Sequence, residues 1–222
     1  ADVDRTVITA NEILAKFGSG PVQEIMRDHP RVSVSLEGTQ REQSETFSSL
    51  LPMFILALFI IYALLAIPLR SYGQPLIIMS VIPFAFVGSV WGHIIMKILG
   101  LLDSMAIMSI MGIVAASGVV VNSSLVLVHA VNHRRADGMS VSDAVIEAAV
   151  SRCRPILLTS LTTFAGLTPL LLNQSVQAGV LIPMATSLAW GVMLATVVTL
   201  LVVPAGYLIL EDAGTRHSAP IA

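Results

Sequence analysis

Three long stretches without an acidic residue constrain this chain more than any other feature. No Asp or Glu occurs within residues 46–102, 104–136 or 148–210. A helix of about 20 apolar residues crosses a hydrocarbon core of ~30 Å, so each stretch is long enough to hold at least one such helix. Of the 222 residues, 55% are hydrophobic and only 12% are charged, against roughly 25% charged in a soluble domain. We therefore predict an α-helical integral membrane protein rather than a soluble enzyme.

The composition also argues against several kinds of site. The net charge of −2 provides no cationic field for nucleic acid. A single cysteine, Cys153, rules out an internal disulfide framework and a multi-cysteine metal site. The G-x-S-x-G, H-E-x-x-H and P-loop motifs are missing, and no expected span contains a carboxylate. We expect no enzymatic activity, no cofactor and no metal centre.

The polar breaks in the apolar stretches predict an all-α membrane fold, a bundle of about five transmembrane helices. These helices are expected near residues 48–69, 75–96, 104–131, 155–172 and 183–210. Between the third and the fourth, residues 139–152 are amphipathic and predict a short helix on the cytoplasmic interface. Ser140 or Ser142 is positioned to cap that helix.

The first 45 residues have the character of a domain outside the membrane. Apolar residues at helical spacing up to Met26 are followed by Arg31–Leu36, whose alternation is typical of a half-buried strand. We therefore expect a short α+β extracytoplasmic remnant, too small to bury a core alone. Thr39 and Glu42 have capping-box spacing, which predicts a helix that begins on a polar stalk and enters the membrane without a break.

The basic residues of the loops predict the orientation of the bundle. With five spans and an external N-terminus, only Lys97 lies on the outer side beyond the N-terminal segment. The inner side then holds Arg70, Arg134, Arg135, Arg152, Arg154 and Arg216. The N-terminus is thus expected on the extracytoplasmic side and the C-terminus in the cytoplasm. His93, one turn from Lys97, is expected at the membrane interface. Because the chain begins without Met, we expect it to be a piece of a longer protein.

Two expected spans carry small or polar residues along one helical face. The face on the third span consists of Ala115, Gly118, Asn122 and His129, and the face on the fourth consists of Thr159, Thr162, Thr163 and Gly166. If the two faces meet, they form either packing contacts worth ~0.6 kcal/mol each or a hydrated path for ions or protons. Spacing alone leaves both interpretations open. His129, near the end of its span, is either an interface anchor or a proton relay.

Five segments resemble the efflux permeases of the RND family. Residues 112–128 (Gly-Ile-Val-Ala-Ala-Ser-Gly-Val-Val-Val-Asn and the six residues after it) resemble the tenth span of these permeases, and residues 152–161 (Arg-Cys-Arg-Pro-Ile-Leu-Leu-Thr-Ser-Leu) resemble the entry into the eleventh. Residues 36–43 and 66–72 resemble the junction around the eighth span, and Val203-Pro204-Ala205 resembles the twelfth. Essentially the whole chain is similar to the C-terminal part of an acriflavin-resistance-type permease, the type that exports hydrophobic and amphiphilic compounds.

The resemblance implies a proton-driven antiporter of the bacterial inner membrane that exports drugs or other amphiphilic small molecules. It implies a homotrimer that works with a periplasmic adaptor and an outer-membrane channel. It also implies an N-terminal half of the same permease, which carries the proton-binding aspartates. Residues 1–45 would then be the end of the periplasmic porter domain, residues 46–212 the C-terminal membrane bundle, and residues 213–222 a cytoplasmic tail.

The resemblance also assigns site residues by motif position. Asn122 takes the place of a lysine of well-studied exporters, Thr159 matches the relay threonine, and Arg152 matches the arginine at the cytoplasmic entrance. Ser123 joins them as a proton-relay partner, and His129 and Thr163 are further candidates for the relay or the interface. Ser123 and His129 stand where similar permeases often have Asp, which removes negative charge from this region and bears on ion coupling.

Two other functions remain compatible with the sequence. One is an RND-like helper in protein translocation or lipid handling. The other is a structural membrane bundle without transport of its own, in which both polar faces stay dry and tolerate leucine.

Overall fold

A computed structural model of the chain describes residues 39–102, 107–173 and 175–217. This part of the chain forms helices joined by short turns, and it contains no strand. The chain divides into two compact units, Ala1–Ser49 and Leu50–Ala222. The helical bundle belongs to the second unit.

Helix α3 (Thr39–Leu69) begins at the residue that the capping-box pattern predicts and continues into the apolar segment without a break. Its apolar side chains remain largely exposed, among them Leu51, Phe59 and Ile67. Only its last turns join the protein core, through Leu65 and Leu69. A helix that is apolar on all sides and exposed requires a hydrocarbon environment, so α3 has the surface of a membrane span.

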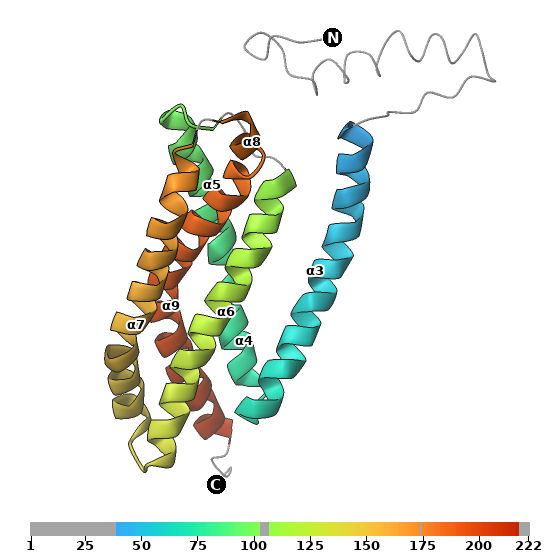
Figure 1. Cartoon of the computed structure of the whole chain (residues 1–222). Helices are drawn as coiled ribbons and strands as arrows, with labels where there is room; N and C mark the ends of the chain where they lie inside the picture. Colours follow the sequence, from blue (N-terminus) through green and yellow to red (C-terminus); the bar gives the residue numbers. More distant parts are fainter. Residues whose placement is uncertain (1–38, 103–106, 174, 218–222) are drawn as a thin grey trace, which may run out of the picture. The chain divides into compact units, whose positions relative to one another are not determined.

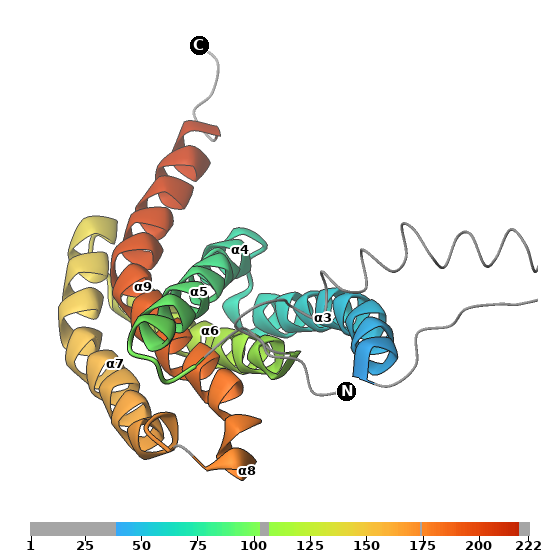
Figure 2. The same cartoon turned by 90° about the horizontal axis from the view of Figure 1, so that it is seen from above.

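Helix α9 is the centre of the bundle, and the other helices of the core contact it (Figures 1 and 2). The helices after α3 are α4 (Gly73–Met79), α5 (Ile82–Ile98), α6 (Ile107–Ala136), α7 (Val141–Leu171), α8 (Val176–Gly179) and α9 (Ile182–His217). Glycines allow the closest approach to α9. A Cβ at Gly88 would lie 2.7 Å from the Trp190 carbonyl oxygen, and a Cβ at Gly112 would overlap the Met184 carbonyl oxygen.

The buried core runs between α6 and α9 and includes side chains of α4 and α7. Its fully or nearly fully buried members include Ile78, Val81, Val120, Leu127, Val128, Val131, Ala144, Val192, Ala195 and Val203. Most of them are β-branched or small, and such side chains let helices pack closely along their whole length. The core therefore fixes which faces of α6 and α7 point away from the bundle.

The predicted count of five transmembrane helices is wrong. Among the described residues, four segments are long and apolar enough to cross a membrane, namely Ser48–Leu69, Gly73–Ile98, Ile107–Ala136 and Ile182–Asp212. The second of these combines α4 and α5, which are separated only by a turn at Ser80 and Val81 ahead of Pro83. The expected placement of the two chain ends on opposite sides of the membrane depended on five crossings, and four candidates do not support it.

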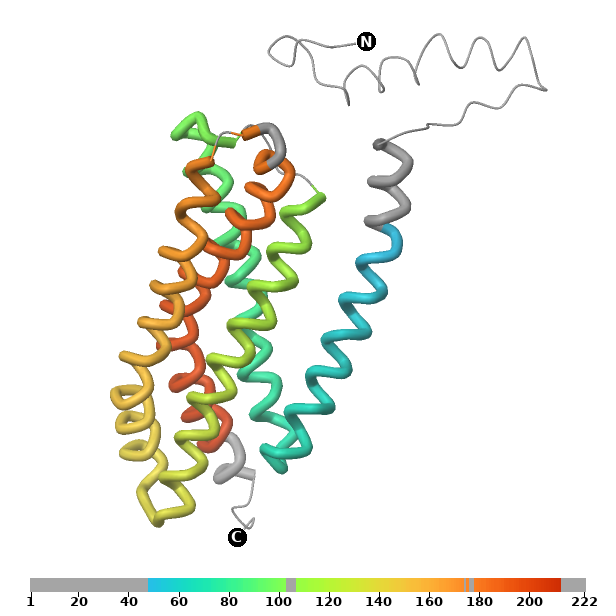
Figure 3. The backbone as a smooth tube through the Cα atoms, viewed as in Figure 1, coloured from blue at the N-terminus to red at the C-terminus, as the bar shows by residue number. Residues whose placement is uncertain are grey.

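The segment predicted as the fourth span is instead the second half of α7. The amphipathic segment and this second half form one continuous helix, capped at Ser140, whose Oγ accepts from the Asp143 backbone N–H at 3.2 Å. Figure 3 shows the uninterrupted path of α7. Its first half contains Asp143, Glu147, Arg152 and Arg154. Within the described residues, α7 is not among the helices that are long and apolar enough to cross a membrane.

The predicted fold class is also corrected, because the structure does not support the α+β remnant at the N-terminus. The part of the chain that the structure describes is helical, without a strand, so the fold is all-α there. The expected strand, residues 31–36, lies outside the described residues.

Candidate functional site

Asn122 lies in the middle of α6 and faces away from the bundle. It is the sixteenth of the thirty residues of the helix, and its side chain is exposed. No hydrogen bond to its amide occurs within the described ranges. The neighbouring Ser123 is half-buried and donates from Oγ to the Val119 carbonyl oxygen at 3.1 Å. Asn122 is therefore an unpaired amide at the depth where a span is most apolar.

The threonines of α7 also lie on an outward face. Thr159 donates from Oγ1 to the Pro155 carbonyl oxygen at 2.8 Å, and Thr163 donates to the Thr159 carbonyl oxygen at 2.8 Å. Thr162 bonds to the same carbonyl at 2.9 Å. Each hydroxyl is thus satisfied by the backbone of its own helix. Because Ser160 Oγ lies 2.5 Å from Thr196 Oγ1 of α9, α7 packs through Ser160 and leaves its threonine face uncovered.

The structure does not join the two predicted faces to each other. Within the described residues, no hydrogen bond connects the polar face of α6 with that of α7. The two helices do meet where the last turn of α6 lies beside the first half of α7. There Arg134 lies 3.2 Å from the Glu147 carboxylate and donates to Ser151 Oγ at 2.8 Å. Arg152 is exposed on α7. The role predicted for these residues in a proton relay remains a prediction.

A polar pocket of about 560 Å³ lies at one end of the bundle. Its lining residues are Pro68, Leu69, Arg70, Gln74, His129, Asn132, His133, Arg135 and Tyr207. His129 borders this pocket, and its predicted place in a relay or at the interface remains a prediction. The pocket was not predicted from the sequence, although Asn132 and Arg135 lie one turn apart on α6, a spacing that places both on one side of the helix.

Hydrogen bonds tie the helices around the polar pocket together. The Asn132 and Gln74 amides bond reciprocally at 2.8 and 3.2 Å, and the Tyr207 hydroxyl donates to Asn132 Oδ1 at 2.8 Å. Arg135 forms an ion pair with Glu211. These contacts join α4, α6 and α9, so one wall of the pocket is held by three helices.

His93 lies inside the protein and not at the membrane interface where it was expected. Its side chain is only 6% exposed. Nδ1 lies 2.8 Å from the Ser89 carbonyl oxygen, which can only accept, so this nitrogen carries a proton. Nε2 lies 2.9 Å from Ser109 Oγ of α6. His93 therefore links α5 to α6 through a buried polar contact.

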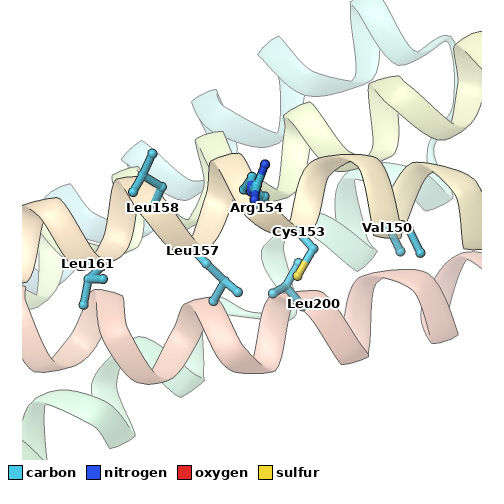
Figure 4. Close-up of a pocket in the computed structure, with 8 residues that line it drawn as sticks. Val150, Cys153, Arg154, Leu157, Leu158, Leu161 and Leu200 are labelled. Carbon is cyan, nitrogen blue, oxygen red and sulfur yellow. The ribbon is translucent and has the colours of Figure 1, made fainter.

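An apolar groove of about 690 Å³ runs between α7 and α9. Figure 4 shows Cys153 and Leu157 pointing toward α9 and Leu200, whereas Arg154 and Leu158 point away from it. Few polar groups line the groove, so it resembles a surface for hydrocarbon more than a site for a polar ligand. The described residues contain no group of three His, Cys, Asp or Glu side chains placed to hold a metal ion.

Apolar helices of membrane-crossing length in the described part of the chain, together with the polar faces of α6 and α7, define a membrane domain. Residues 15–211 match the AcrB/AcrD/AcrF family, and the chain belongs to this family of RND permeases. The resemblance stated from the sequence is thereby confirmed.

Relatives in this family carry several different descriptions. The swarming motility protein SwrC of Bacillus subtilis is 30% identical over 82% of this chain and 17% of its own length. The nickel-cobalt-cadmium resistance protein NccA of Alcaligenes xylosoxydans xylosoxydans is 34% identical over 68% of this chain and 14% of its own length. The multidrug resistance protein MdtC of Erwinia amylovora is 29% identical over 80% of this chain and 17% of its own length.

A solved structure shares the fold. The crystal structure of a heavy metal efflux pump superposes with a TM-score of 0.70 at 25% identity, covering 90% of this chain and 20% of the pump. The chain thus spans a fifth or less of the length of these relatives. Family membership and the four candidate spans support a location in the inner membrane.

Proposed function

We propose that this chain is part of a proton-driven efflux transporter that exports drugs or amphiphilic small molecules across the inner membrane. Membership of a family of RND efflux permeases supports the transport class, and the similarity to MdtC supports the substrate class. In this proposal the protein is a transporter and not an enzyme. Its partners are an N-terminal half of the same permease, two further copies in a homotrimer, a periplasmic adaptor and an outer-membrane channel.

The unpaired amide of Asn122 is the observation that carries the proposal. Moving an amide from water to hydrocarbon without a hydrogen bond costs roughly 4–8 kcal/mol. A polar side chain at this depth therefore faces protein or water in the assembled molecule. Asn122 is exposed here, so the polar face of α6 requires a cover that the described residues do not supply. A polar or hydrated surface at that position is what a proton path needs.

The hydrogen bonds of α7 suggest how its threonines take part. The Thr159 hydroxyl already bonds to the Pro155 carbonyl oxygen of its own helix. Exchanging that partner for another polar group costs little, because a hydrogen bond contributes a net ~1 kcal/mol. In this mechanism, protonation of carboxylates in the N-terminal half of the permease lets Asn122 and Thr159 exchange partners. Ser123, Thr163 and Arg152 are the other groups of the relay in this mechanism.

The basic residues support an orientation of the bundle. Arg70 and Arg135 line the polar pocket, and Arg134 is adjacent to Arg135. Basic residues gather on the cytoplasmic side of inner-membrane proteins. We therefore assign the end of the bundle with the polar pocket to the cytoplasm.

Substitution of Asn122 and Thr159 in the full-length protein tests this function. In membrane vesicles with an imposed proton gradient, Asn122→Leu or Thr159→Val should lower the rate of substrate efflux at least about tenfold. Each variant loses one polar contact worth ~1.4 kcal/mol in the transport cycle. Leu158→Val, an exposed apolar neighbour of Thr159, is the matched control. Full transport by both variants at normal expression would remove Asn122 and Thr159 from the relay, whereas a wild-type protein without proton-driven efflux would favour a structural bundle or a translocation or lipid-handling helper.

Metal-cation export is a second candidate function. The similarity to NccA and to a heavy metal efflux pump favours it. The same vesicles distinguish the two candidates, because a metal exporter will move nickel or cobalt ions and leave fluorescent amphiphiles untransported.

A further inference from the structure

Among the described residues, Arg70 of the polar pocket is a cation without a protein counter-charge. Arg135 is paired with Glu211, and His133 Nδ1 lies 3.5 Å from Asp137. Arg70 is exposed in the turn between α3 and α4, and no acidic residue of the described ranges pairs with it. Because it has no such partner, Arg70 is available for an anionic group from outside the chain. A guanidinium binds phosphate through two parallel hydrogen bonds.

The backbone at Arg70 is also unusual. Its φ angle is +49°, the only positive φ of a non-glycine residue in the described part of the chain. A left-handed conformation costs a side-chain-bearing residue about 1–2 kcal/mol. Such a cost is retained mainly where the conformation serves a ligand or a turn. Here it ends α3 abruptly and leaves Arg70 beside the pocket.

The remaining pocket wall is preorganised. Asn132 Oδ1 accepts from both Gln74 Nε2 and the Tyr207 hydroxyl, and Tyr207 is only 2% exposed. These groups hold one another in place before any ligand arrives. Pro68 and Leu69 supply apolar surface next to the polar wall. The pocket therefore offers a cation, fixed polar groups and an apolar edge to the same ligand.

The position of the pocket identifies the kind of ligand. It lies where three candidate spans begin or end, at Leu69, Gly73 and Ala136. Phospholipid headgroups occupy this boundary, and basic pockets between spans bind anionic headgroups there. We propose that the polar pocket binds the headgroup phosphate of an anionic phospholipid, with Arg70 as its main charge. This site does not depend on transport or on a proton relay.

Native mass spectrometry of the full-length protein tests the proposal. The wild-type protein should retain phosphatidylglycerol in preference to phosphatidylcholine. Arg70→Gln should weaken this retention about fivefold, the effect of one basic residue near an anionic surface. Lys97→Gln, which removes the same charge at the far end of α5, should leave it unchanged. Arg70→Lys should retain part of the preference.

Several results would overturn the proposal. Equal losses in Arg70→Gln and Lys97→Gln would show an effect of net charge alone. Displacement of the bound lipid by millimolar inorganic phosphate would indicate a site for free anions. A wild-type protein without a preference for phosphatidylglycerol would show that the pocket does not select an anionic headgroup. Equal melting temperatures of wild type and Arg70→Gln establish that the variant is folded.

Discussion

At the scale of single residues, His93 is the side chain whose surroundings differ most from expectation. Both ring nitrogens have partners, Ser89 on its own helix and Ser109 on α6. We expect His93→Leu to lower the free energy of unfolding by about 1–3 kcal/mol, because buried polar partners lose a hydrogen bond. A melting temperature measured in detergent checks this.

His93→Gln is the conservative comparison for that experiment. Its amide can still donate toward Ser89 and accept from Ser109, so we expect a smaller loss than with leucine. If His93→Leu melts at the wild-type temperature, the buried contact contributes nothing to stability.

Residue types revealed polar positions but not their partners. Asn122 was predicted as part of a polar face of its span, and the structure places it in the middle of α6. Its lack of a partner did not follow, because which helix covers a face depends on packing. In the same way, the sequence did not distinguish Ser160 from the threonines around it, although Ser160 is the residue that contacts Thr196. Spacing along one helix cannot distinguish a buried hydroxyl from an exposed one a residue away.

At the scale of helices, two glycines of α6 predict opposite outcomes. A Cβ at Gly112 would overlap the Met184 carbonyl oxygen and lie 2.7 Å from Ser187 Cβ, whereas nothing described lies within 4 Å of a Cβ at Gly118. We expect Gly112→Ala to destabilise the protein by about 1–3 kcal/mol, since a backbone carbonyl cannot move aside easily. Thermal unfolding of each single variant measures this.

Gly118→Ala is the matched control on the same helix. Alanine in place of an exposed helical glycine stabilises by roughly 0.5–1 kcal/mol, so we expect no loss. A loss would instead show that another segment of the full-length protein packs closely on this face of α6. Unchanged stability of Gly112→Ala would contradict the packing of α6 against α9.

Helix positions were largely predictable because hydrophobic runs of this length leave few alternatives in a membrane. The capping pattern at Thr39 located the start of α3, and Ser140 was one of two predicted caps for α7. The continuity of α7 was not predictable from the change in polarity at Pro155. A proline there interrupts only part of the backbone hydrogen bonding, and packing against α9 maintains the helix.

At the scale of the whole molecule, the exposed surface of the four candidate spans and of the two polar faces must match its surroundings, either hydrocarbon or a polar environment. α3 and α6 both expose side chains at mid-helix depth, but α3 exposes Phe59 and α6 exposes Asn122. The first suits hydrocarbon and the second does not. The exposed surface of this chain is therefore divided between lipid and a polar environment supplied by the rest of the assembly.

Thiol labelling of the full-length protein tests that division directly. In a background with Cys153→Ser and no other cysteine, Asn122→Cys and Thr159→Cys should react with a charged, membrane-impermeant thiol reagent at least about tenfold faster than Phe59→Cys, because only the hydrated thiolate is reactive. Phe59 is the matched position, the twelfth of the 22 residues of its candidate span. Faster labelling at positions 122 and 159 under an imposed proton gradient would link the polar environment to transport. Equally slow labelling at all three positions would mean that both polar faces are dry, and the proton path would then have to lie elsewhere.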